Sequence, residues 1–168
     1  MSLRDDLTKL QNQLGEGTLQ RSYGSIISYM SQARSYFMTR DGERAVSALY
    51  QGVFDMTYFA LFPPALKSRG LKLAIVFDYE SFTFQVWLAA RNRTVQRKYW
   101  QLLHDCGWSG GRIVEPAAGV DAIVQRDVAS AMELEAADAL TARVEAVACE
   151  LLDDLVAFLD THDTETAV

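Results

Sequence analysis

Two consecutive runs in the middle of the chain, Leu71–Tyr79 and Phe82–Ala89, constrain the fold most strongly because both alternate in polarity. Successive side chains of a β-strand point to opposite faces, so each run has one apolar side and one mixed side. Only Glu80-Ser81 separates them, a spacing that suits an antiparallel hairpin with helices packed on its apolar face. The mixed side carries Lys72, Ala74, Val76, Asp78 and Glu80 from the first run and Thr83, Gln85 and Trp87 from the second.

Further elements are expected on both sides of this hairpin. Val53–Leu61 is dense in aromatic and β-branched residues and ends before Pro63-Pro64, which predicts a third strand. Shorter extended segments are expected at Arg112–Glu115 and Ala122–Val128. Apolar spacing predicts four helices. The first is Ser2–Leu14, stopped by Gly15 and Gly17, and the second is capped by Thr18 and reaches about Met38. The third is Thr94–Cys106, and the long last helix is capped by Ser130, with Glu133 completing a capping box.

The predicted fold class is therefore α+β, with an antiparallel sheet of three to four strands packed by N-terminal helices, a middle helix and a long C-terminal helix. A length of 168 residues favours a single domain over residues 1–168. Within it, we expect a long acidic amphipathic helix at 130–160 and a flexible tail at 161–168.

Apolar seams on the first and last helices predict either packing within the chain or a homodimer, and we expect a homodimer. The first seam is Leu3, Leu7, Leu10 and Leu14, and the last is Leu140, Val144, Val147, Leu151, Leu155 and Phe158. The net charge is −6 and is concentrated near the C-terminus, where ten Asp and Glu residues from Ser130 onward face one Arg. An acidic outer helix face accounts for this distribution.

Composition excludes several classes of protein. Cys106 and Cys149 are too few for a disulfide framework, no apolar run is long enough for a membrane span, and the N-terminal residues lack a signal-peptide core. We therefore expect a cytoplasmic protein without a membrane partner. The sequence Gly107–Gly111 matches the G-x-S-x-G nucleophile pattern, but it follows a predicted helix instead of a strand, which argues against a catalytic Ser109.

Two groups of residues are candidates for a site. Asp55, Asp78 and Glu80 lie on or beside neighbouring strands and could hold a divalent ion in a hydrolase or nuclease-like enzyme, although the Glu-x-Lys of such nucleases is missing. Arg91, Arg93, Arg97 and Lys98 form an acid-free basic stretch at the start of a helix that Asn92 can cap. A helix N-terminus with arginines favours a small anion, whereas the negative whole-chain charge argues against nucleic acid.

The basic stretch belongs to a longer pattern of residues. This pattern consists of Leu49–Gly52, Asp55–Phe59, Leu71–Phe77 and Val86–Arg93, followed by Gln96 and Tyr99-Trp100. It resembles an uncharacterised family of small bacterial cytosolic proteins. The resemblance implies a bacterial cytosolic setting and supplies no catalytic residues.

The sequence therefore predicts a non-enzymatic binding or accessory protein for a small anionic or aromatic ligand. The expected ligand-binding residues are Asp55, Tyr58, Glu80, Trp87, Arg91, Asn92 and Arg93. No catalytic residue, metal ligand or cofactor is expected. The alternatives are the metal-dependent enzyme and a structural homo-oligomer without a ligand site.

Overall fold

The computed structural model describes residues 2–42 and 45–163, and within these residues six strands form one antiparallel sheet in the order β1-β2-β3-β4-β6-β5. The strands are β1 Tyr50–Gln51, β2 Met56–Leu61, β3 Leu71–Asp78, β4 Thr83–Ala90, β5 Arg112–Ile113 and β6 Ala122–Ser130. The helices are α1 Leu3–Glu16, α2 Thr18–Asp41, α3 Pro64–Lys67, α4 Arg93–Asp105, the 3-10 helix η2 Ala131–Ala136 and α5 Ala137–His162.

The predicted α+β class is confirmed, but the predicted sheet of three to four strands was too small. β1 contains only two residues, too few to leave an alternating pattern in the sequence. β5 and β6 lie in the segments Arg112–Glu115 and Ala122–Val128 that were expected to be extended, and both join the sheet. β6 pairs with β4 along most of its length, with two irregularities in register, and this extends the sheet beyond the central hairpin.

The central hairpin is formed by β3 and β4, and its two faces are those that the alternation predicts. Its turn is wider than predicted: Asp78 pairs with Thr83, so four residues, 79–82, make the connection instead of Glu80-Ser81 alone. The Asp78 carboxylate accepts a hydrogen bond from the Ser81 backbone N–H at 2.9 Å and closes this wider turn. Phe82 adopts a positive φ of 58° there.

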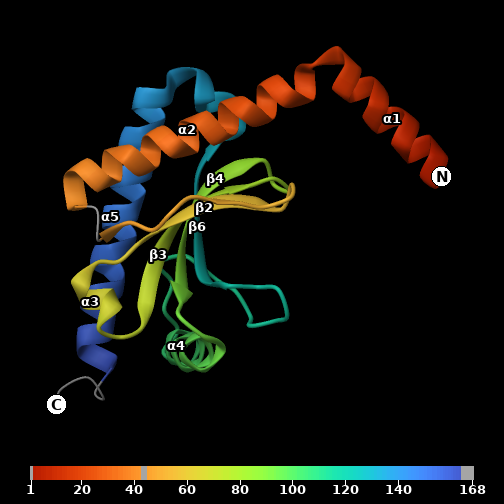
Figure 1. Cartoon of the computed structure of the whole chain (residues 1–168). Helices are drawn as coiled ribbons and strands as arrows, with labels where there is room; N and C mark the ends of the chain where they lie inside the picture. Colours follow the sequence, from red (N-terminus) through yellow and green to blue (C-terminus); the bar gives the residue numbers. More distant parts are fainter. Residues whose placement is uncertain (1, 43–44, 164–168) are drawn as a thin grey trace.

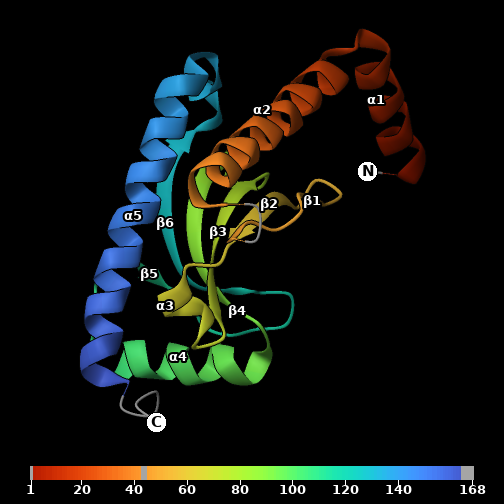
Figure 2. The ribbon, with the colours of Figure 1, turned by 60° about the vertical axis from the view of Figure 1, so that its left-hand side comes forward.

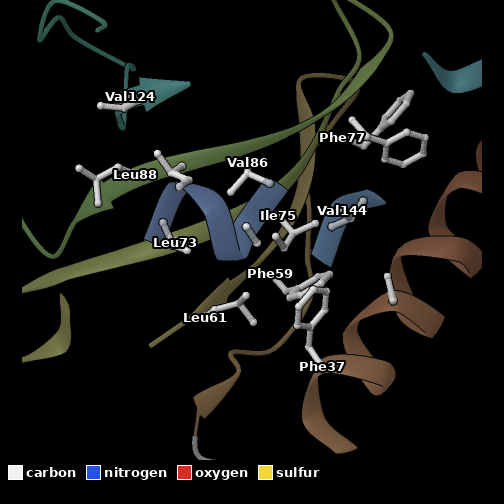
Figure 3. Close-up of a cluster of buried hydrophobic side chains, with 14 of the residues drawn as sticks. Phe37, Phe59, Leu61, Leu73, Ile75, Phe77, Val86, Leu88, Val124 and Val144 are labelled. Carbon is white, nitrogen blue, oxygen red and sulfur yellow. The ribbon is translucent and has the colours of Figure 1, made fainter. Parts of the chain in front are cut away.

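The hydrophobic core lies on one face of the sheet, between the strands and two long helices. Phe59, Ile75 and Val86 from successive strands are fully buried on this face. Figure 3 shows Phe37 of α2 and Val144 of α5 pointing toward the same strand side chains. Burying such large side chains contributes roughly 1.5–3 kcal/mol each, so this layer holds the helices on the sheet.

Helices α2 and α5 both cover the core face, while α4 lies across one end of the sheet (Figures 1 and 2). The apolar seam of α5 therefore packs against the sheet of the same chain. Its buried residues are Leu140, Val144, Ala148, Leu151, Leu155 and Leu159. Val147 and Phe158, predicted in the seam, are only partly buried, because the neighbouring residues Ala148 and Leu159 face the core instead.

Helix α1 projects away from the rest of the molecule (Figure 1). Ser2 and Asp5 form a reciprocal capping box at its start, and Gly17, in the left-handed conformation with φ 73°, separates it from α2. The predicted boundaries were wrong in detail, since Gly15 lies inside the helix and Thr18 is the first residue of α2 and not its N-cap.

Other predicted boundaries also shift. Strand β2 begins at Met56 instead of Val53, because residues 52–55 turn the chain and Phe54 takes a positive φ of 58°. Ser130 caps the short η2 helix, and Glu133 pairs with Arg143 at 2.6 Å instead of completing a capping box. Of the predicted tail at 161–168, Thr161 and His162 belong to α5, and residues 164–168 lie outside the described residues.

None of the helices described here combines the length and the apolar character of a membrane span.

Candidate functional site

The face of the sheet opposite the core is open and contains a hollow. Its floor consists of small or short side chains, Ala74, Val76 and Ala89, on adjacent positions of β3 and β4. Larger side chains form its walls and enclose a cavity of about 200 Å³. These walls are Met56, Tyr58, Lys72, Trp87, Ala90, Arg91 and Asp121.

Two cations line this cavity without a partner. Lys72 lies on β3, and Arg91 directly follows β4, where its backbone N–H donates to the Gly70 carbonyl at 2.9 Å. Within residues 2–42 and 45–163, neither side chain makes a hydrogen bond or an ion pair. The cavity wall also carries the Asp121 carboxylate, which pairs with Arg93 at 3.6 Å and with neither of these two cations.

Two aromatic rings stand beside these cations. Tyr58 packs against Tyr50, with ring centroids 5.0 Å apart. Burial, and after it the charge of Asp121, raises the pKa of Tyr58, so its hydroxyl remains protonated and able to donate at neutral pH. Trp87 faces the same cavity from β4.

A chain of side-chain hydrogen bonds along the hairpin holds Trp87 in place. The Trp87 indole N–H donates to Gln85 Oε1 at 2.6 Å, and Gln85 Nε2 donates to Thr83 Oγ1 at 3.0 Å. Ser81 continues the chain toward the Asp78 carboxylate. Because its only N–H is already used, Trp87 offers a ligand its ring surface and not a donor.

The groove continues past Trp87 into a second cavity of about 510 Å³. Met56, Trp87 and Asp121 line both cavities and join them into one groove. The second part is predominantly acidic and contains Asp78, Glu80, Asp127 and Arg112. The open face is therefore basic at the Lys72 end and acidic at the hairpin end, with Trp87 between.

The structure brings some of the predicted site residues together and separates others. Tyr58, Trp87 and Arg91 line the first cavity, and Glu80 lines the second. Asn92 lies outside both cavities and caps α4, because its Oδ1 accepts from the Val95 backbone N–H at 2.9 Å.

Asp55 also lies outside the groove, in the turn before β2. Its Oδ1 accepts a hydrogen bond from the Met56 backbone N–H at 2.7 Å. A Cβ atom added at Gly52 would come within 1.7 Å of the same oxygen, so the turn requires glycine there. The Asp55 carboxylate therefore stabilises the turn before β2.

Arg93 points away from the basic cavity and binds the loop that precedes β6. Its Nη1 donates to Gln96 Oε1 at 2.7 Å and to the Val120 carbonyl, and its guanidinium pairs with Asp121 at 3.6 Å. Gln96 is buried and donates to the Val120 carbonyl at 2.9 Å. Arg93 therefore positions the segment that carries Asp121, a wall residue of the groove.

Replacing Arg93 with alanine is expected to lower the free energy of unfolding by about 1–2 kcal/mol, because the buried Gln96 oxygen loses its donor. Chemical denaturation measures this change. Arg97→Ala, at an exposed position on the same helix, is the matched control, with an expected effect within about 0.5 kcal/mol. Equal effects of the two substitutions would contradict the structural role assigned to Arg93.

The carboxylates predicted as an alternative metal site do not converge. Asp78 is engaged with Ser81, Asp55 with the turn before β2, and Glu80 is exposed in the hairpin turn. Among the residues that the structure describes, no three His, Cys, Asp or Glu side chains are placed to hold a metal ion. The geometry gives the metal-dependent enzyme no support.

Another cavity, of about 300 Å³, lies between α2, α5 and the β2–α3 connection. Its cation is Arg40, whose Nε pairs with Asp41 at 3.0 Å and whose Nη1 pairs with Glu145. The charge of Arg40 is thus compensated, in contrast to that of Lys72 and Arg91. This cavity is a weaker candidate for an anion site.

Sequence reasoning missed Lys72 as a site residue, although it stands on the mixed side of the first strand run. The alternation places Lys72 and Ala74 on the same face of that strand. A cation beside a small side chain on one sheet face indicates a hollow with a charged rim, and this pattern could have identified Lys72. No local sequence pattern identifies Asp121 and Met56 as site residues, because they line the groove only through the pairing of segments that are distant in sequence.

Comparison with known proteins yields a family and no activity. No curated protein and no solved structure matches the chain. The model of a family described as "Domain of unknown function (DUF7000)" matches residues 3–159, which is most of the chain. The protein that carries this open, partly basic sheet face therefore belongs to the DUF7000 family.

Proposed function

We propose that the protein is a cytosolic, non-enzymatic binding protein for a small anionic ligand that carries a flat aromatic group. The anionic group, a phosphate or a carboxylate, would sit between Lys72 and Arg91, and the flat group would lie against Trp87 and Tyr58. The homodimer predicted from the sequence is part of the same proposal.

The observation that carries this proposal is the pair of uncompensated cations in one cavity beside two aromatic rings. Lys72 is half-buried and Arg91 is exposed. A half-buried cation without a partner is unfavourable unless a ligand or water satisfies it, so an anion at Lys72 would stabilise the folded protein. Aromatic side chains add stacking surface for a planar group, and a guanidinium adds paired donors for phosphate or carboxylate oxygens.

Binding is expected to be measurable by isothermal titration with two probes, inorganic phosphate and a nucleoside monophosphate that adds a flat ring. The monophosphate should bind more tightly because it uses both the cations and the rings. Replacing Lys72 and Arg91 together with alanine should weaken its binding at least tenfold, since each lost charge-assisted hydrogen bond contributes roughly 1.5–3 kcal/mol.

A matched control removes the same charge elsewhere. Lys67 on α3 and Arg97 on α4 lie outside the groove, so replacing both with alanine should leave the affinity nearly unchanged. Equal weakening by both double substitutions would indicate nonspecific attraction by net charge. An absence of binding to either probe would favour the structural homo-oligomer without a ligand site.

A further inference from the structure

The leucine seam of α1 is exposed, and none of its residues is buried by the part of the chain that the structure describes. Leu3, Leu7, Leu10 and Leu14 are 74%, 56%, 43% and 41% exposed, and no residue of α1 is buried. Figure 2 shows α1 standing off the sheet at the far end of α2. Four large apolar side chains in one row on a protruding helix mark an interaction surface.

The spacing of this seam suits a helical partner. The steps of four, three and four residues place Leu7 and Leu14 at a positions of a heptad and Leu3 and Leu10 at d positions. When two such helices align antiparallel, a positions meet d positions. Leu3 then packs against the partner's Leu14, and Leu7 packs against the partner's Leu10, so the seam is complementary to itself.

The flanking charges agree with this alignment. The seam is bordered by Arg4, Asp6, Gln11 and Gln13. In the antiparallel pair Arg4 lies opposite a glutamine and so does Asp6, which leaves no like charges facing each other. A parallel pair would instead bring the two acidic first turns, with Asp5 and Asp6, side by side and would align the helix dipoles unfavourably.

A lipid surface fits the helix less well. Interfacial helices that bind anionic membranes carry Lys and Arg along their polar face. The polar face of α1 carries Arg4 and Lys9 against Asp5, Asp6 and Glu16. The acidic excess argues against an anionic membrane as the occupant of the seam.

We infer that α1 is a dimerisation arm, which pairs antiparallel with the same helix of a second copy of this chain. Two helices of 14 residues bury less surface than the roughly 1,600 Å² of a standard interface, so the dimer should dissociate on dilution. The inference does not depend on the ligand proposed for the sheet face.

Sedimentation equilibrium over a range of concentrations tests the inference. The wild-type chain should show a monomer–dimer equilibrium, and replacing Leu7 and Leu10 together with aspartate should raise the dissociation constant at least tenfold. The control adds the same two charges to the polar face of α1 through Thr8→Asp and Asn12→Asp, and it should dimerise like the wild type. Since none of these residues is buried, circular dichroism should show a retained fold in both variants.

A wild-type chain that stays monomeric at all concentrations would overturn the inference. So would a Leu7→Asp, Leu10→Asp variant that dimerises like the wild type, because another surface would then form the dimer.

Disulfide trapping distinguishes the two alignments in a chain whose Cys106 and Cys149 are replaced with serine. In an antiparallel pair the two copies of position 3 lie about 16 Å apart along the helices, too far for a disulfide, which needs Cα atoms within about 7 Å. A Leu3→Cys chain should therefore not cross-link to itself. Mixed with a Leu14→Cys chain, it should form a mixed dimer. Self-cross-linking of Leu3→Cys would overturn the antiparallel arrangement.

Discussion

Replacing Asp163 with alanine is expected to lower the free energy of unfolding by about 3–5 kcal/mol, because its carboxylate is the buried counter-charge of Arg69. The Asp163 side chain is only 2% exposed, and its Oδ2 lies 3.3 Å from Arg69 Nε. It also accepts a hydrogen bond from the Tyr99 hydroxyl at 2.6 Å. The substitution leaves a nearly buried guanidinium without this charge and removes the hydrogen bond that links the C-cap of α5 to Tyr99 of α4. Urea denaturation measures the loss.

Asp160 provides the control for this prediction, because it binds the same arginine from the surface. Its Oδ1 lies 2.8 Å from Arg69 Nη2, a shorter distance than that of Asp163, but its side chain is 62% exposed. Exposed ion pairs contribute about 0.2–1 kcal/mol, so Asp160→Ala should have a small effect. A larger effect of Asp160→Ala than of Asp163→Ala would show that distance matters here more than burial.

The pKa of Tyr99 gives a second readout for the Asp163→Ala variant. Burial, together with the hydrogen bond to Asp163 and its negative charge, raises the pKa of Tyr99 to about 12. Without the carboxylate, the pKa should move toward the ordinary value near 10, and an ultraviolet titration of tyrosinate detects this shift. An unchanged titration would mean that burial alone sets the pKa.

The central hairpin could be predicted from the sequence because local alternation determines which side chains share a face. Leu73, Ile75 and Phe77 are buried against the helices, while Lys72 and Asp78 lie on the open face, as the period of two requires. The width of its turn could not be predicted, since it depends on the Asp78 side chain bonding to the backbone of Ser81.

The sequence predicted extended segments at 112–115 and 122–128, where β5 and β6 lie, but not the pairing of these strands, because their partners are distant in sequence. β6 joins β4 across the 31 residues between Ala90 and Ala122, and β5 contributes only Arg112 and Ile113. β1 was not predicted, because a strand of two residues has no period to recognise.

Part of the candidate site could be predicted because its residues lie on the hairpin, directly after it or on the neighbouring strand β2. Tyr58, Trp87 and Arg91 were placed on one exposed sheet face by their positions in or next to predicted strands. Arg93, two residues after Arg91, was grouped with it because both belong to one basic stretch. Its side chain instead turns to the Val120 carbonyl, a partner 27 residues away that no local pattern reveals.

Filling the floor of the groove is expected to abolish ligand binding, because the hollow exists only where β3 and β4 carry small side chains. Ala74 lies directly opposite Trp87 in the strand register and lines the basic cavity. Isoleucine at position 74 suits a β-strand and would occupy the space that the flat group of a ligand requires. We expect the affinity for a nucleoside monophosphate to fall more than 100-fold, which corresponds to about 2.7 kcal/mol.

Calorimetric titration of Ala74→Ile should therefore show no saturable binding, while thermal unfolding remains cooperative. Gln51→Ile, which adds a similar side chain on the edge strand β1 outside the groove, should bind like the wild type. The two substitutions separate loss of space from a general effect of added apolar surface. If Ala74→Ile binds the monophosphate as tightly as the wild type while Lys72→Ala with Arg91→Ala does not, the cations recognise the anion at the rim and the hollow contributes nothing. The requirement for a flat aromatic group would then be removed, and the ligand class would reduce to any small anion that can reach two neighbouring cations.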